Sequence, residues 1–142
     1  MNENEKSISK TLFAVTILGN NSAIPAFNRH PTAQIVTIAD QQILIDCGEG
    51  TQMQITKYKI RKSKIHHILI SHLHGDHYYG LIGIITSMGL LGRKDNLHLH
   101  APAALKEIID LHLKVSATTL PYQLHFHPIE QEGVIVNAHK FT

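Results

Sequence analysis

Cysteine and net charge are both scarce in this sequence. Cys47 is the single cysteine among 142 residues, so an intrachain disulfide is excluded and a reducing compartment suits the chain. Thirteen Lys and Arg side chains against eleven Asp and Glu leave a net charge of only +2. Proteins that bind nucleic acid with their whole surface are strongly basic, and this chain does not belong to that class.

Long apolar runs are also missing. No segment is long enough to cross a membrane, and the first residues carry no apolar signal region. The chain is nevertheless 43% hydrophobic and only 17% charged, which suits a packed core rather than disorder. We therefore expect a soluble cytoplasmic protein with no membrane partner. We also expect that residues 1–142 belong to one domain, with a polar lead-in at 1–10.

The order of the predicted elements indicates an α/β protein. Apolar runs separated by turn residues predict strands at 12–18, 33–39, 42–46, 64–71, 97–100, 123–127 and 134–138. Helices are predicted at 51–58, with Thr51 as its cap, at 78–91 and at 102–113. Antiparallel strands followed by strand–helix alternation predict a mixed β-sheet with packed helices.

Side chains that can bind a metal are concentrated between His72 and His77. This segment, HLHGDH, holds three imidazoles and one carboxylate within six residues. Neutral imidazoles and carboxylates are ligands that zinc takes from proteins, and a catalytic zinc usually takes three of them. Four donors in one loop therefore predict two ions side by side, an arrangement that clamps the oxygens of a hydrolytic displacement.

The flanking segments place this motif on a loop between an apolar strand and an apolar helix. In an extended chain His72 and His74 point the same way, because side chains alternate. Gly75 allows the turn that swings Asp76 and His77 back toward them. Nine further histidines need no metal and are interpreted as structural or surface residues: His30, His66, His67, His98, His100, His112, His125, His127 and His139.

Several segments resemble a known family. Residues 70–81, ISHLHGDHYYGL, look like the signature of the metallo-β-lactamase fold superfamily. LGNNSAIP at 18–25, IDCGEGTQ at 45–52 and MGLLGR at 88–93 narrow the resemblance to ribonuclease Z, the endonuclease that removes the 3′ trailer from precursor tRNA. The resemblance implies an αββα-type fold, two Zn²⁺ ions in the full-length enzyme, and precursor tRNA as the partner.

The resemblance also implies a role for each donor. His72 and His74 would bind the first zinc, and Asp76 and His77 the second. Asp76 would also be the catalytic general base that orients or deprotonates the attacking water. Asp46 would support the site by orienting a ligand imidazole; the alternative interpretation is a turn or capping carboxylate.

Two further groups of residues are candidate RNA contacts. Five cations stand within eight residues: Lys57, Lys59, Arg61, Lys62 and Lys64. They are placed to attract RNA phosphates, although a solvated helix end and loop explains them better. Tyr78 and Tyr79 either stack on a base near the metals or pack at the helix start.

Part of the family pattern has no match in this sequence. The family uses another His, a bridging Asp and a last His as further ligands, and neither His139 nor Asp110 fits these positions. We therefore expect the N-terminal half of a metallo-β-lactamase-like domain, which binds one zinc or none and is catalytically dead alone. Half a sheet exposes apolar surface, which favours self-association, and we expect a homodimer.

Two other functions stay open. The first is another hydrolase of the same fold, acting on small phosphodiesters, sulfate esters, thioesters or β-lactams. The segment from Asp46 to Gln52 argues against it, because that segment points to ribonuclease Z. The second is a truncated metal-binding module without catalysis.

Overall fold

A single sheet forms the centre of the chain in this computed structural model, which describes residues 13–24 and 26–137. Its strands are β1 (Phe13–Gly19), β2 (Ala33–Ile38), β3 (Gln41–Ile45), β4 (Ile65–Leu69), β5 (Leu97–Ala101) and β6 (Leu124–Pro128). The helices are α1 (Thr51–Lys57), α2 (Gly75–Tyr78), α3 (Leu81–Leu90) and α4 (Leu105–Val115), with a short 3-10 turn η1 (Lys62–Lys64). The predicted lead-in at 1–10 and His139 lie outside the described residues.

The strands follow one another across the sheet in chain order, from β1 at one edge to β6 at the other. β1, β2 and β3 are antiparallel, and a tight turn at residues 39–40 joins the last two. β3 to β6 are parallel, because helical segments carry the chain back to the same end before each new strand. The predicted mixed α/β sheet is therefore confirmed.

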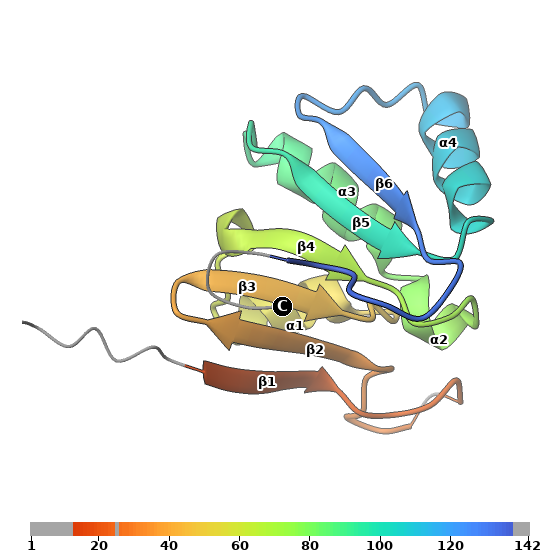
Figure 1. Cartoon of the computed structure of the whole chain (residues 1–142). Helices are drawn as coiled ribbons and strands as arrows, with labels where there is room; N and C mark the ends of the chain where they lie inside the picture. The colour runs from red at the N-terminus through yellow and green to blue at the C-terminus, as the bar shows by residue number, and fades with distance from the viewer. Residues whose placement is uncertain (1–12, 25, 138–142) are drawn as a thin grey trace, which may run out of the picture.

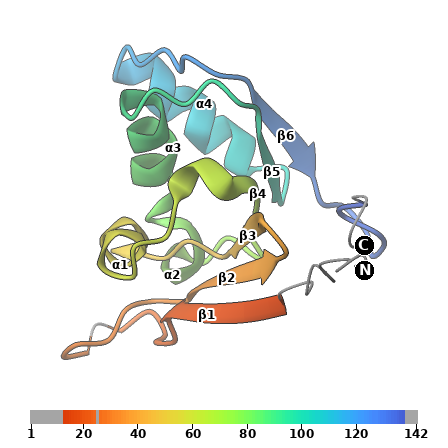
Figure 2. The same cartoon turned by 90° about the vertical axis from the view of Figure 1, so that its left-hand side faces the viewer.

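Helices α1, α3 and α4 cover one face of this sheet, as Figures 1 and 2 show. The core between the two layers is apolar, and its fully buried side chains include Ile35, Leu44, Ile55, Ile68, Ile84 and Leu99. Burial of each such side chain contributes about 1.5–3 kcal/mol. This packing fixes the strand ends, and with them the loops that follow. None of the described helices is long and apolar enough to cross a membrane.

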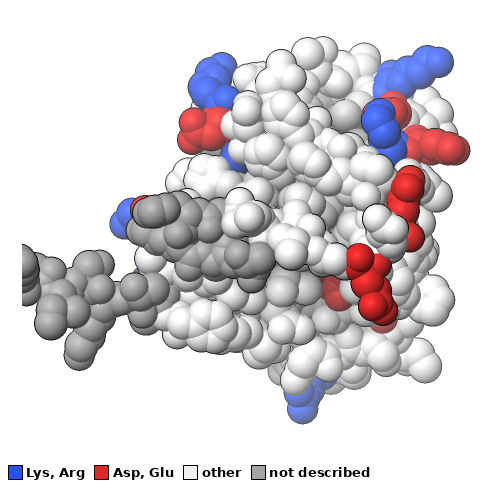
Figure 3. All heavy atoms as spheres, viewed as in Figure 1, with Lys and Arg blue, Asp and Glu red and all other residues white. Residues whose placement is uncertain are grey.

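The opposite face of the sheet is not covered by a described helix. On β1 it carries Phe13, Val15 and Ile17, whose side chains are 67%, 48% and 48% exposed. On β4, β5 and β6 it carries histidines. The described chain after β6 turns back across this face (Figure 1). In the part of this face that Figure 3 leaves visible, the centre is uncharged and acidic side chains gather on the right.

Four predicted elements differ in detail, and the first is the helix expected at 102–113, which begins at Leu105. The helix expected at 78–91 is interrupted at Tyr79 and Gly80, because the Gly80 N–H donates to the Cys47 carbonyl, 2.9 Å away. Gly50, at φ 80°, is the cap of α1, and Thr51 is the first helical residue. Residues 134–137 form no strand, and Ala138 lies outside the described residues.

Candidate metal centre

The predicted metal loop leaves the carboxyl end of β4 and enters α2. β4 ends at Leu69, and His74 occupies the extended capping position before α2, with ψ 141°. Asp76 lies in the first turn of that helix, where free N–H groups favour a carboxylate. Gly75 has no positive φ, so the expected backbone role is wrong. A Cβ at this position would instead meet the Tyr79 ring at 2.1 Å.

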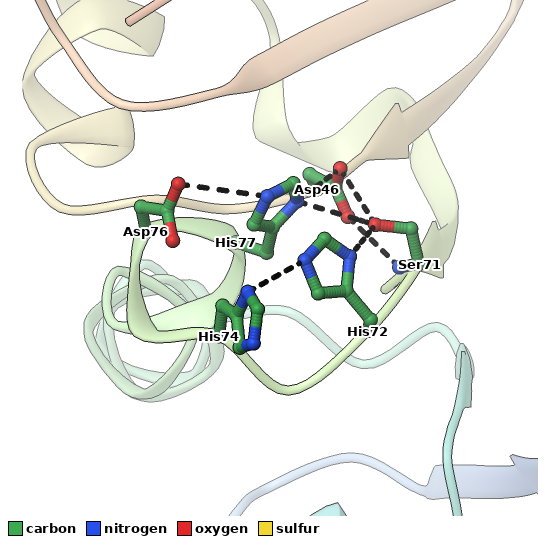
Figure 4. Close-up of polar contacts among 6 residues, drawn as sticks. All are labelled: Asp46, Ser71, His72, His74, Asp76 and His77. Carbon is green, nitrogen blue, oxygen red and sulfur yellow. Dashed lines mark hydrogen bonds and ion pairs between the residues drawn. The ribbon is translucent and has the colours of Figure 1, made fainter. Parts of the chain in front are cut away.

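The four candidate ligands form two pairs (Figure 4). His72 Nε2 lies 3.2 Å from His74 Nδ1, and Asp76 Oδ2 lies 3.5 Å from His77 Nε2. Two ligand atoms of one tetrahedral zinc are separated by about 3.3–3.4 Å. Each of these two distances fits one edge of such a tetrahedron. The His72 and His77 rings are also close, with centroids 3.8 Å apart, so the four donors form one cluster and the pairing stays a prediction.

Asp46 lies directly behind these ligands (Figure 4). Its carboxylate accepts hydrogen bonds from the Ser71 N–H at 2.8 Å and from His77 Nδ1 at 2.8 Å. Because a carboxylate only accepts, His77 Nδ1 carries the proton, and Nε2 is left with the lone pair that a metal needs. Asp46 reaches this position through a positive φ of 56° directly after β3.

Ser71 is a site residue that sequence reasoning missed. Its hydroxyl donates to the Asp46 carboxylate, at 2.9 and 3.0 Å from the two oxygens, and lies 3.0 Å from His72 Nδ1. Because the hydroxyl proton is donated to Asp46, the Ser71 oxygen accepts a hydrogen bond from His72 Nδ1. His72 Nε2 therefore keeps its lone pair, on the side that faces His74. The only signal in the sequence was a hydroxyl residue directly before the motif.

The segment after β3 also holds the metal loop in place through main-chain hydrogen bonds. The Cys47 N–H donates to the His77 carbonyl at 2.7 Å, and the Cys47 carbonyl accepts from Gly80. A Cβ on Gly48 would lie 2.3 Å from the Asp76 carbonyl, so only glycine allows this approach. The Cys47 side chain is fully buried, and burial raises the pKa of its thiol, so it is an inert packing residue.

The candidate ligands are of the types that zinc binds, but too few of them are arranged around one ion. Imidazole nitrogens and a carboxylate are suitable donors, and their free atoms face one another in pairs. Within residues 13–24 and 26–137, however, no group of three or more His, Cys, Asp or Glu side chains is arranged to hold a metal ion. Two donors per ion are fewer than the three protein ligands of a usual catalytic zinc.

The family described as Anti-Pycsar protein Apyc1 matches residues 13–131, most of the chain. The chain belongs to this family. It is also homologous to ribonuclease Z from Bacteroides fragilis, with 45% identity over 132 residues. That match covers 92% of this chain and 43% of the relative, so the chain spans less than half of the relative's length.

Two solved structures have the same architecture. Human tRNase Z, short form, superimposes with a TM-score of 0.75 and 33% identity, over 80% of this chain and 43% of that one. Zn²⁺-bound PqqB from Methylobacterium extorquens superimposes with a TM-score of 0.60 and 14% identity, over 82% and 49% of the two chains. The chain of this Apyc1 family member therefore has the metallo-β-lactamase fold of ribonuclease Z in part, and is related to hydrolases of that fold.

The basic residues do not gather at the metal loop. Lys57 ends α1, Lys59 and Arg61 follow it, and Lys62 and Lys64 lie in η1. All five come before β4, whereas the metal loop follows β4. β4 has five residues at a rise of about 3.3 Å each, so its two ends, and with them the basic segment and the metal loop, lie about 16 Å apart. Lys59, Arg61 and Lys62 line a cavity there, whereas Lys57 and Lys64 are not part of its lining.

The two tyrosines after the motif take different positions. Tyr78 is half-buried and packs against the core, while Tyr79 is 67% exposed. Their rings meet edge to face with centroids 5.1 Å apart. Tyr78 therefore packs at the helix start, as one of the two interpretations expected, and Tyr79 is the one of the pair that a base could reach.

The open face of β4, β5 and β6 carries a histidine array that sequence reasoning treated as separate residues. The array consists of His67, His98, His100, His125 and His127. His67 Nδ1 lies 3.1 Å from His100 Nε2, and His98 Nδ1 lies 2.9 Å from His127 Nε2. Burial, reinforced by the neighbouring imidazoles, lowers the pKa of both His67 and His100 from 6.5 to about 4.

Proposed function

We propose that this chain carries the first ligands of the zinc site of a phosphodiesterase that removes the 3′ trailer from precursor tRNA. The observation that carries the proposal is the pairing of His72 with His74 and of Asp76 with His77, with Asp46 behind them. The 45% identity to a ribonuclease Z supports the choice of RNA as substrate. The remaining ligands would come from outside the described residues.

Each residue of the loop has a distinct task in this proposal. His72 Nε2 and His74 Nδ1 would hold one zinc, and Asp76 and His77 Nε2 the other. Zinc lowers the pKa of water toward neutrality and neutralises charge on the phosphate. Asp76 accepts the proton of the attacking water as general base. Asp46 and Ser71 keep the imidazoles in the tautomers and orientations that ligation needs.

A second candidate function is hydrolysis of a cyclic nucleotide. The family match over residues 13–131 favours it, because that family is described as an anti-Pycsar protein. Both reactions break a P–O bond of a phosphodiester, so the same metal loop would serve either one. The two functions differ in the size of the substrate and are separated by direct assay.

The test compares this chain alone with the same chain joined to the remaining part of the Bacteroides fragilis ribonuclease Z. Zinc content, cleavage of a trailer-bearing precursor tRNA and hydrolysis of 3′,5′-cyclic nucleotides are measured for both. We expect the 142-residue chain alone to be inactive. The joined protein should bind zinc and cleave the precursor tRNA, and Asp76→Ala should lower its rate by about 10²–10⁴-fold.

His112→Ala is the matched control, because His112 lies on α4, away from the loop. It should leave both metal content and cleavage unchanged. Cleavage by the unjoined chain, or full activity of the joined Asp76→Ala variant, would contradict the proposal. Hydrolysis of a cyclic nucleotide without cleavage of precursor tRNA would replace the first function with the second.

A further inference from the structure

The cavity lined by Lys59, Arg61 and Lys62 lies on the helical side of the molecule, at the end of β4 opposite the metal loop. Its volume is about 700 Å³, within the range of small-molecule sites. Apolar side chains form its floor and part of its rim: Ile55 from α1, Ile60 from the loop after it, Met88 from α3, and Leu91, 71% exposed, directly after α3. Cations stand around this floor: Lys59, Arg61, Lys62 and Lys94.

The wall of this basic cavity is held in place by Arg93. The Arg93 side chain is buried, and its guanidinium donates to the carbonyls of Asp95 and Asn96, both at 2.8 Å, and of Lys62 at 3.3 Å. These bonds join η1, which carries Lys62, to the loop before β5, which carries Lys94. Arg93 is committed to main-chain carbonyls, so the other cations are the ones available to a ligand.

The four rim cations have no anionic partner within the described residues. Asp95 is the single acidic residue in the lining, so the four rim cations and the Arg93 guanidinium face one negative charge. A phosphomonoester carries about −1.5 to −2 charges at pH 7 and matches this excess better than a carboxylate does. Arg61 can bind two phosphate oxygens at once through its planar guanidinium.

We infer that this basic cavity binds a nucleoside monophosphate, with the phosphate on Lys59, Arg61 and Lys94 and the nucleoside over the apolar floor. The excess of positive charge favours a phosphate group, and the apolar floor favours an uncharged group attached to that phosphate. The choice of a nucleoside rests on the proposed function, and specifically on its second candidate, because hydrolysis of a cyclic nucleotide releases a nucleoside monophosphate, whereas removal of an RNA trailer releases a chain that ends in a phosphate. The site is distinct from the metal loop.

The test is an isothermal calorimetric titration of AMP into the metal-free 142-residue chain. Inorganic phosphate and a 5′-phosphorylated RNA trinucleotide are titrated in the same way as further probes. AMP should bind saturably, and phosphate at least about tenfold more weakly, because it leaves the floor uncovered. Tighter binding of AMP than of the trinucleotide assigns the cavity to a free nucleotide, and the reverse assigns it to an RNA end. Absence of saturable binding by both overturns the inference.

Two pairs of variants locate the site. Arg61→Ala should weaken AMP binding by about tenfold, since it removes a charge-assisted contact, whereas Lys114→Ala on α4 should not. Leu91→Glu puts a negative charge in the lining, on a side chain that is 71% exposed, whereas Leu90→Glu puts one on an 89% exposed neighbour outside the lining. Equal effects of Leu90→Glu and Leu91→Glu would overturn the assignment.

A last variant separates this inference from the proposed function. His72→Ala combined with His74→Ala should abolish cleavage by the joined protein and leave AMP binding to the chain unchanged. Loss of AMP binding in that double variant would mean that the nucleotide sits at the metal loop, and the inference fails. Failure of the cleavage assay alone leaves the cavity assignment intact, because binding is measured without metal or substrate.

Discussion

Asp46 connects three parts of the molecule at the scale of a single residue. It follows β3, accepts the Ser71 N–H at the end of β4, and holds His77 on α2. Its side chain is 9% exposed, so each of these bonds is shielded from water. One carboxylate thus determines both the course of the metal loop and the tautomer of one candidate ligand.

We predict that Asp46→Asn lowers the zinc affinity of the joined protein by about 10–100-fold, because an amide holds the His77 ring less firmly than a carboxylate does. Competition with a chromophoric chelator measures this affinity. Asp110→Asn, which changes an exposed carboxylate on α4, is the control and should have no effect. Unchanged zinc affinity in Asp46→Asn would show that Asp46 is only a turn residue.

Gly80 provides a second prediction at this scale. A Cβ there would lie 2.2 Å from the Gly48 carbonyl oxygen, which is main chain and has no room to move. Gly80→Ala should therefore lower the free energy of unfolding by about 1–3 kcal/mol in urea denaturation. Gly83→Ala, whose Cβ would meet only the end of the Gln52 side chain at 3.1 Å, should be neutral or stabilising. Equal losses in the two variants would refute the argument.

At the scale of elements, three adjacent parallel strands assemble the histidine array. His67, His98 and His125 lie opposite one another across β4, β5 and β6, and their rings stack at 5.1 and 5.0 Å. An imidazole pair that shares a hydrogen bond needs one donor and one acceptor, so two doubly protonated rings cannot form it. The array is therefore stable as a set of neutral rings.

This arrangement predicts that the free energy of unfolding decreases as the pH is lowered. The unfolded chain takes up protons on these histidines near pH 6.5, whereas the pKa of His67 and His100 in the folded protein is about 4. Their contribution is complete above about pH 6.5 and is lost as the pH falls toward 4. After allowance for solvent screening, the loss is on the order of 1 kcal/mol for each residue.

Urea denaturation at pH 7.5, 5.5 and 4.5 measures this effect. The double variant His67→Leu with His100→Leu should show a flatter pH dependence than the unchanged chain, because two of the shifted groups are removed. His112→Ala, outside the array, should keep the original slope. An unchanged slope in the double variant would mean that these two imidazoles do not control acid stability.

At the scale of the whole molecule, the sheet has one covered face and one open face. The open face is apolar on β1, where Phe13, Val15 and Ile17 are about half exposed or more, at 67%, 48% and 48%. Exposed apolar patches of this kind are typical of association sites. The homodimer expected from the sequence stays a prediction, and this edge of the sheet is its most direct test.

We predict that Val15→Lys shifts the 142-residue chain toward monomer in sedimentation velocity, because a charge on β1 disfavours burial of the open face. Ile24→Lys changes an exposed apolar residue outside the sheet and should leave the sedimentation coefficient unchanged. A chain that is monomeric without any substitution would remove the basis for the expected homodimer.

The sequence by itself determined the mixed sheet and the place of the metal loop between a strand and a helix. Both follow from local signals: apolar periodicity, glycine turns and the fixed spacing of donors within six residues. The same local signals failed at Gly80, where a hydrogen bond to Cys47, far away in the chain, interrupts a helix that periodicity alone would continue.

Only the tertiary structure decided that Ser71 stands with Asp46 behind the ligands and which histidines belong together, although the resemblance had already implied a supporting role for Asp46. Asp46 and Ser71 are 25 positions apart, and His67 and His100 are 33 apart, so no periodicity relates them. The basic cavity likewise depends on Arg93 joining two distant segments. These sites depend on contacts between elements, and such contacts form only when the strands and helices pack around a common core.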